Sequence, residues 1–183
     1  MTILFVGDVF GKPGRRAVQD LLPRVKADYG VDFTIANGEN LAGGLGATPE
    51  TINEILAAGV DLVSLGNHVW KKKEIYAFLD DPQVRAVRPA NFPPGAPGRG
   101  WTLARAQNDP GCPLVAVLNL QGRIFMDAID CPFRTADALL PAIVEQSGLI
   151  IVDFHAEATS EKEAMFRYLD GRVTAVIGTH THV

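Results

Sequence analysis

Short β-branched apolar runs alternate with helical patterns along this chain, and this alternation limits the possible folds more than any other feature. The six runs with the length of buried strands are Ile3–Val6, Phe33–Ala36, Leu62–Leu65, Leu114–Leu118, Leu149–Val152 and Val173–Ile177. Strands that alternate with amphipathic helices are typical of the α/β class. We therefore expect an α/β fold.

Helix signals stand between several of these strands. The three expected helices cover Arg15–Lys26, the residues from Thr48 to Ala58, and those from Thr159 or Ser160 to Leu169. The second has the clearest start, because Thr48 can act as N-cap and Pro49 suits the first helical position. Thr159 or Ser160 is expected to cap the third.

One segment interrupts the alternation. Arg88–Gly111 is rich in proline and glycine around one strand-like stretch, Trp101–Ala106, and is expected to be an irregular excursion. The alternation resumes too soon after it for a second full domain. With 183 residues, 47% of them hydrophobic, the chain suits a single domain, 1–183, with one large core.

Polar side chains follow the apolar runs at five places. They are Asp8, Glu39, Asn40, Asn67, His68, His155, His180 and His182, and they include all four histidines of the chain. In open α/β sheets, ligands bind outside the carboxyl ends of the strands. We expect these side chains to share one rim, with His180 and His182 facing one cavity from an extended backbone.

Carboxylate, amide and imidazole donors in this mixture suit iron, manganese or zinc, and the lack of thiolate argues against a closed structural zinc site. The set is too large for one tetrahedral ion. It suits two ions that share a bridging carboxylate at roughly 3.5–4 Å, where a bound hydroxide can attack phosphorus.

Charge and hydropathy exclude other classes of protein. The net charge of −4 argues against long nucleic acid as a ligand, since phosphate backbones need a clustered basic surface. No apolar stretch approaches the ~18 residues of a membrane span. The N-terminal Met1–Val6 lacks the basic region of a signal peptide, so a cytoplasmic location is expected.

Five ordered motifs carry a resemblance to a known family. They are Phe5-Val6-Gly7-Asp8, Asn37-Gly38-Glu39-Asn40, Gly66-Asn67-His68-Val69-Trp70, His155, and Thr179-His180-Thr181-His182. In this order they resemble the motifs of the calcineurin-like binuclear metallophosphoesterases. The Gly-Glu-Asn variant is similar to the YmdB-like bacterial subgroup, described as 2′,3′-cyclic-nucleotide 2′-phosphodiesterases. The resemblance spans residues 3–183.

The resemblance implies a layered α-β-β-α sandwich and a role for each motif residue. One ion would be held by Asp8, Glu39, Asn40 and His182, and the other by Glu39, Asn67, His155 and His180. His68 would donate a proton to the leaving oxygen. The implied reaction is hydrolysis of a small cyclic nucleotide at its 2′ bond, with iron favoured and manganese or zinc as alternatives.

The chain departs from the wider superfamily at two positions. Phe10 stands where many members have a histidine, and Glu39 stands where they have a bridging aspartate. The departure bears on metal identity more than on reaction class. Family members continue beyond the last histidine, so we expect the C-terminal strands of the fold to be missing from this chain.

Two other functions stay open at this stage. A broad phosphatase or nucleotidase could use the same metals, and monoesters would then compete with cyclic diesters. A metal-binding regulatory or scaffold protein would have no need of His68 as a proton donor. The hydrophobic helix faces leave a homo-oligomer open.

Overall fold

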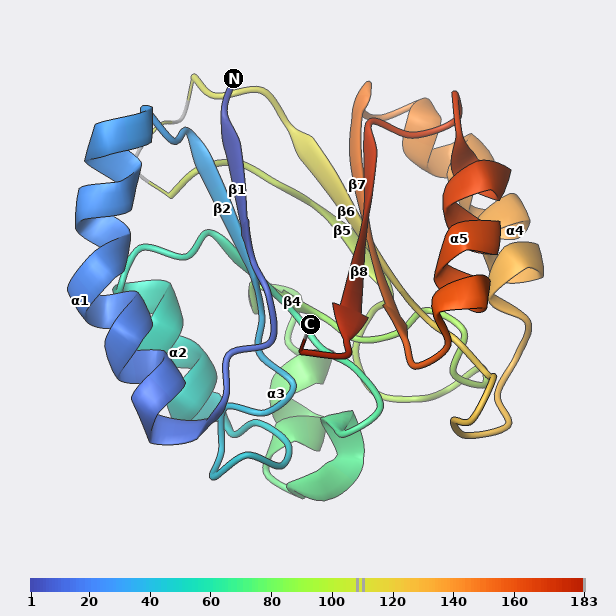
Figure 1. Ribbon diagram of the computed structural model, residues 1–183, viewed down its shortest axis with the longest axis horizontal. Helices are drawn as coiled ribbons and strands as arrows, with labels where there is room; N and C mark the ends of the chain where they lie inside the picture. Colours follow the sequence, from blue (N-terminus) through green and yellow to red (C-terminus); the bar gives the residue numbers. More distant parts are fainter. Residues whose placement is uncertain (108, 110, 183) are drawn as a thin grey trace.

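Two four-stranded sheets form the centre of the molecule in the computed structural model, which describes residues 1–107, 109 and 111–182 (Figure 1). The first sheet is parallel, in the order β1 (Ile3–Val6), β2 (Phe33–Asn37), β3 (Leu62–Ser64) and β4 (Ala86–Val87). The second has the order β5 (Trp101–Ala104), β6 (Val115–Gln121), β7 (Leu149–Ala156) and β8 (Ala175–His180). Within it, β5 is antiparallel to β6 and the other pairs are parallel.

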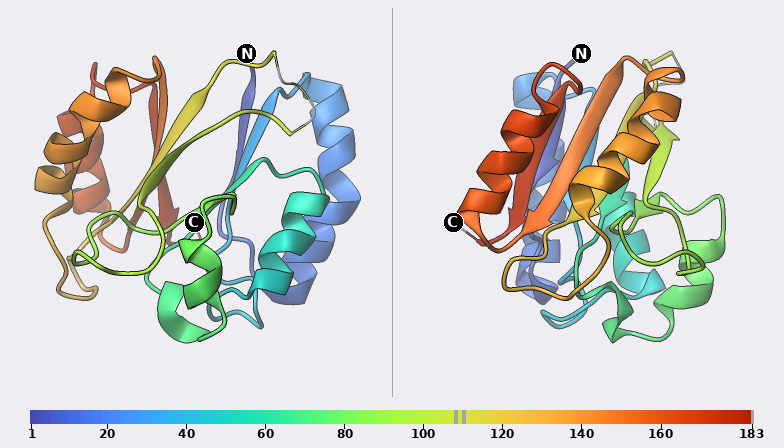
Figure 2. Two further views of the ribbon diagram at one scale, coloured as in Figure 1. Left: turned by 180° about the vertical axis from the view of Figure 1, so that it is seen from behind. Right: turned by 90° about the vertical axis from the view of Figure 1, so that its right-hand side faces the viewer.

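Helices cover the outer face of each sheet (Figure 1 and Figure 2). The elements are α1 (Gly11–Tyr29), α2 (Pro49–Ala57), α3 (Ile75–Asp80), α4 (Pro132–Val144), α5 (Thr159–Leu169) and a short 3-10 helix, Val69–Lys71. Helices α1 and α2 pack on the first sheet, and α4 and α5 on the second. The expected α-β-β-α order of layers is confirmed.

Alternation along each strand explains the layers. In β2, Phe33 and Ile35 point between the sheets and pack with Val115 and Val117 of β6. Ala36, one position on, belongs to the cluster under α1 and α2. Successive side chains of a strand point to opposite faces, so every central strand supplies one row to the inter-sheet core and one to a helical layer.

The inter-sheet rows become polar at the carboxyl ends of the strands. Asn37 continues the row of Phe33 and Ile35, Ser64 that of Leu62, Asp153 and His155 that of Ile151, and Thr179 that of Ile177. Each of these five polar side chains is buried. The sheet geometry therefore places a buried polar cluster at one end of an apolar layer.

The strand and helix bounds differ from expectation at several points. Strand β7 continues to Ala156, so His155 lies inside the strand and not after it. Helix α2 is confirmed, with Thr48 Oγ1 accepting a hydrogen bond from the Thr51 backbone at 3.3 Å. Helix α5 starts at Thr159, but its N-cap is Ala158, so capping by Thr159 or Ser160 is wrong.

Helix α4 was not expected from the sequence. The segment has Pro132 in its first turn and Pro141 inside the helix, and proline residues at this spacing are more typical of a loop. Helix α3 and strand β4 are too short to leave a periodic pattern. In the irregular segment, β5 ends at Ala104, and Asn108 and Pro110 lie outside the described residues. Over the described ranges, the structure contains no helix with the length and hydropathy needed to cross a membrane.

Candidate metal centre

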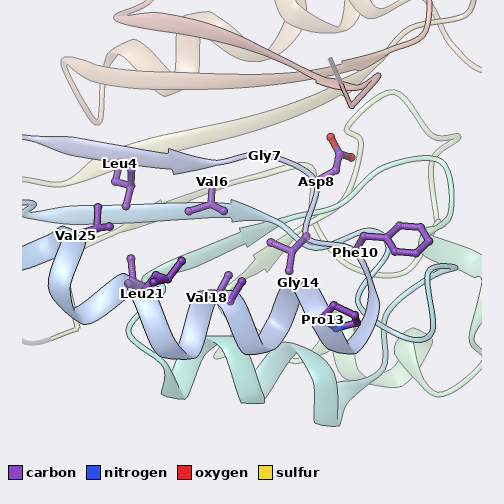
Figure 3. Close-up of a pocket in the computed structure, with 13 residues that line it drawn as sticks. Leu4, Val6, Gly7, Asp8, Phe10, Pro13, Gly14, Val18, Leu21 and Val25 are labelled. Carbon is purple, nitrogen blue, oxygen red and sulfur yellow. The ribbon is translucent and has the colours of Figure 1, made fainter.

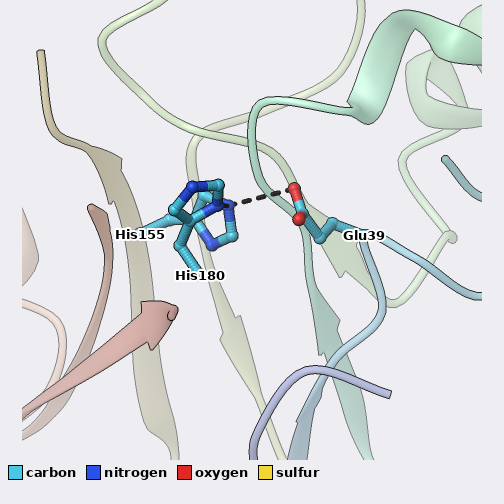
Figure 4. Close-up of side chains that lie close together, drawn as sticks. All are labelled: Glu39, His155 and His180. Atoms are coloured by element: carbon cyan, nitrogen blue, oxygen red, sulfur yellow. Dashed lines mark hydrogen bonds and ion pairs between the residues drawn. The ribbon is translucent and has the colours of Figure 1, made fainter. Parts of the chain in front are cut away.

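The carboxyl ends of β2, β3, β7 and β8 bring four of the expected ligands together. Glu39 Oε2 lies 3.0 Å from His155 Nε2, and Asn67 Oδ1 also lies 3.0 Å from that nitrogen. His180 Nδ1 is 3.2 Å from His155 Nε2 (Figure 4). One ligand atom from each of Glu39, His155 and His180 lies within 4.8 Å of the others. We call Glu39, Asn67, His155 and His180 together the Glu39 cluster.

The electrostatics of the Glu39 cluster suit a cation. Burial alone would raise the pKa of Glu39, but the hydrogen bond and charge of His155, together with His68, lower it to about 2. Burial disfavours the charged form of His155, yet its partner Glu39 raises its pKa. Burial, followed by the charge of His155, lowers the pKa of His180. Two imidazole nitrogens 3.2 Å apart cannot both carry a proton toward each other, whereas a cation can accept both lone pairs.

Asp8 gives a second sign that the donors fit a metal. Its Oδ1 atom is buried and has no hydrogen-bond partner among the described residues. Leaving a buried acceptor unpaired costs roughly 1–3 kcal/mol, and more for a charged group. A bound cation would satisfy this oxygen, so the donor set fits metal ions.

The other expected ligand set is less closely assembled. Asp8 Oδ1 lies 4.0 Å from His182 Nε2, and Asp8 Oδ2 accepts the His180 backbone N–H at 3.0 Å. Asn40 turns its amide nitrogen to Glu39 Oε1, at 2.9 Å. His180 has φ 87°, which is left-handed, so the expectation that His180 and His182 extend from one straight strand is wrong. The chain turns at His180 because β8 ends there.

His68 lies beside the Glu39 cluster with one ring nitrogen engaged. Its Nδ1 is 2.8 Å from Asn40 Oδ1. The Asn40 amide nitrogen donates to Glu39, so its oxygen must be the atom that faces His68, and His68 Nδ1 is the donor. The side chain is 24% exposed, so the ring is accessible to a bound molecule.

A buried polar layer beneath the Glu39 cluster was not expected from the sequence. Asp153 is fully buried and accepts hydrogen bonds from Asn37, Ser64 and Thr179. Burial raises the pKa of Asp153, while the charge of His155 and these hydrogen bonds act in the opposite direction. The available signal was a carboxylate two residues before His155 in an otherwise apolar strand, on the same face.

Two cavities adjoin Asp8 and differ in character. An apolar groove between β1 and α1 is lined mainly by Leu4, Val6, Val18 and Leu21 and ends at Asp8 (Figure 3). A more polar cavity is lined by residues that include Asp8, Gly178, Thr181 and His182. The second also offers the hydroxyl group of Thr181 and the imidazole of His182 to a charged ligand.

Comparison with known proteins adds to this geometry. A model of the YmdB-like protein family matches residues 4–183. A Bacillus subtilis protein named 2′,3′-cyclic-nucleotide 2′-phosphodiesterase is 49% identical over the whole chain, which covers 67% of that relative.

Two solved structures resemble the chain. One, of a hypothetical protein from Thermus thermophilus, has a TM-score of 0.89 at 49% identity, over all of this chain and 69% of its own. The other, of a phosphatase from Mycoplasma pneumoniae, has a TM-score of 0.87 at 32% identity, over 99% of this chain and 64% of its own. The chain thus spans about two thirds of the length of its relatives.

Proposed function

Because the chain belongs to the YmdB-like protein family, we propose that it is a metal-dependent phosphodiesterase that opens 2′,3′-cyclic nucleotides at the 2′ bond and releases 3′-nucleotides. The observation that carries the proposal is the Glu39 cluster, in which a carboxylate, an amide oxygen and the imidazole of His180 lie within hydrogen-bond distance of His155 Nε2. The name of the Bacillus subtilis relative supports the choice of substrate.

In the proposal, the Glu39 cluster holds one ion, and Asp8, Glu39, Asn40 and His182 hold the other, with Glu39 shared. Such ions supply a water of lowered pKa and positive charge opposite the developing negative charge on phosphorus. Nitrogen and oxygen donors suit iron, manganese or zinc, and the family resemblance favours iron among them. We also propose that residues 1–183 act as one domain; the core cluster shared by both sheets supports this.

His68 protonates the departing ribose 2′-oxygen in this proposal. The acceptor at Asn40 Oδ1 fixes the proton on Nδ1 and orients the ring, so that a second proton on Nε2 is the one available for transfer. A general acid next to the ligands, but with its own partner, matches this role.

The test is the substrate preference of the metal-loaded protein. We expect a higher kcat/KM for 2′,3′-cyclic AMP than for 5′-AMP or 3′,5′-cyclic AMP, and no competition by the monoester. The chelator-treated protein is the control and should be inactive on all three. Equal turnover of the monoester would replace the proposal with a broad phosphatase, the activity named for the Mycoplasma pneumoniae structure. Metal binding without turnover of any ester would instead favour a regulatory protein.

A further inference from the structure

A chain of hydrogen bonds leads from the inter-sheet core to the ligand His155. Thr179 Oγ1 lies 2.8 Å from His155 Nδ1 and 2.6 Å from Asp153 Oδ1. All three side chains are at most 1% exposed, so water does not compete for these contacts. These hydrogen bonds join protein side chains directly. They end on the imidazole of His155, which lies at the centre of the Glu39 cluster.

The partners of Asp153 Oδ2 determine which group donates and which accepts in each of these hydrogen bonds. Asn37 Oδ1 accepts the Glu39 backbone N–H at 3.1 Å, which fixes the orientation of the Asn37 amide. Asn37 Nδ2 must then donate to Asp153 Oδ2, at 3.0 Å, and it also approaches Thr179 Oγ1, at 3.4 Å. Ser64 donates its hydroxyl proton to the same Oδ2. Asp153 is therefore surrounded by donors, and its Oδ1 is the acceptor for the Thr179 hydroxyl.

We propose that Asp153 and Thr179 are positioning residues that hold the ring of His155 through Nδ1 and accept its Nδ1 proton when Nε2 binds the metal. A threonine hydroxyl has one proton, and Thr179 gives it to Asp153, so Thr179 can only accept from His155. His155 Nδ1 is then the donor, which leaves Nε2, the nitrogen that faces Glu39, Asn67 and His180, as the one that can bind a cation. Partners of this kind behind a ligand histidine fix its ring and its tautomer.

The inference rests on the proposed function in one respect, namely that His155 is a metal ligand. It adds the residues that orient this ligand toward the metal. The hydrogen bonds of Asp153 also link the two sheets, because Asn37 and Ser64 come from the first sheet and Asp153 and Thr179 from the second. The register of the sheets relative to each other thus bears on the chemistry of His155.

Asp153→Asn gives the sharpest test because it should exchange donor and acceptor in the hydrogen bonds that join residue 153, Thr179 and His155. Asn37 and Ser64 require an acceptor at the Oδ2 position, so the new amide must put its oxygen there and its NH₂ group toward Thr179. Thr179 would then donate to His155 Nδ1, and the proton of His155 would move to Nε2, where it blocks the metal. At a Zn²⁺ concentration that just saturates the parent, long-range nitrogen–proton NMR should show His155 protonated on Nδ1 and not on Nε2 for the parent, and Nε2–H for Asp153→Asn.

Metal affinity gives a second readout, through titration of each variant with Mn²⁺. Loss of such outer partners typically weakens metal binding roughly 10–100-fold, and we expect a loss of about this size for Asp153→Asn and for the isosteric Thr179→Val. Thr179→Ser keeps the hydroxyl and should keep both the tautomer and the affinity. Ser64→Ala is the matched control, because it removes a hydrogen bond to Asp153 but not the link to His155.

These outcomes separate the inference from the proposed function. An unchanged His155 tautomer in Asp153→Asn, or Mn²⁺ affinity of Thr179→Val equal to that of the parent, would overturn the inference. A Ser64→Ala loss as large as that of Thr179→Val would do the same, since it would mean a packing effect. Correct tautomers and affinities in a protein that hydrolyses no cyclic nucleotide would leave the inference standing and reject the proposed phosphodiesterase.

Discussion

Replacing His68 with alanine should lower turnover of 2′,3′-cyclic AMP about 10²–10⁴-fold, the usual contribution of a general acid, while metal content stays at the parent level. His68 contacts Asn40 through Nδ1 and lies outside the Glu39 cluster, so its removal takes away a proton donor and not a ligand of that cluster. Steady-state kinetics with elemental analysis of the same samples measures both quantities.

The leaving group supplies the control for His68→Ala. A nitrophenolate leaves without being protonated, so hydrolysis of bis(4-nitrophenyl) phosphate should fall much less than hydrolysis of the cyclic nucleotide. An equal fall for both substrates would show that His68 does not act on the leaving oxygen. Loss of metal in His68→Ala would make it a ligand and reassign its role.

Gly66→Ala should disable the site from a position that has no functional group. A Cβ atom at Gly66 would lie 2.4 Å from both Glu39 Oε2 and His155 Nε2, far inside van der Waals contact. Gly66 does not have a left-handed φ, so alanine suits its backbone, and the nearest conflicts are with the two ligands. Displacing catalytic groups by about 1 Å can cost on the order of 10²-fold in rate. We expect at least that loss, with reduced Mn²⁺ affinity and a cooperative unfolding transition retained.

Gly7→Ala is the matched control for Gly66→Ala. Gly7 immediately precedes Asp8, but a Cβ atom there would meet nothing within 4 Å. This variant should bind Mn²⁺ as the parent does. Parent-like metal affinity in Gly66→Ala, measured by the same titration, would mean that Glu39 and His155 are not held where the structure has them.

The parts of the fold that could be predicted are those written in local patterns. The β-branched runs predicted the long strands to within a few residues, because short runs of this composition are typical of buried strands. Thr48 and Pro49 located α2 because capping depends on residues adjacent in sequence. Helix α4 was missed because Pro141 is tolerated by tertiary packing that the sequence pattern does not display.

The candidate site divides in the same way. Strand ends in an α/β fold share one edge, so the expectation that Asn67, His155 and His180 lie near Glu39 needed only the order of the strands. The contacts of Asp153 with Ser64 and Asn37 could not be predicted, because they depend on how two separate sheets stack. The left-handed backbone conformation of His180 could likewise not be predicted from the sequence, since histidine rarely adopts it.

Phosphorus NMR of 2′,3′-cyclic AMP incubated with the metal-loaded protein tests the central claim most directly. Asp8→Asn is the control, because Asp8 contributes the buried carboxylate oxygen that has no partner among the described residues. We expect a 3′-monophosphate signal from the parent protein, and none from Asp8→Asn at the same concentration. A 2′-monophosphate product, or an unchanged cyclic diester signal from a parent protein with its metals bound, would contradict it.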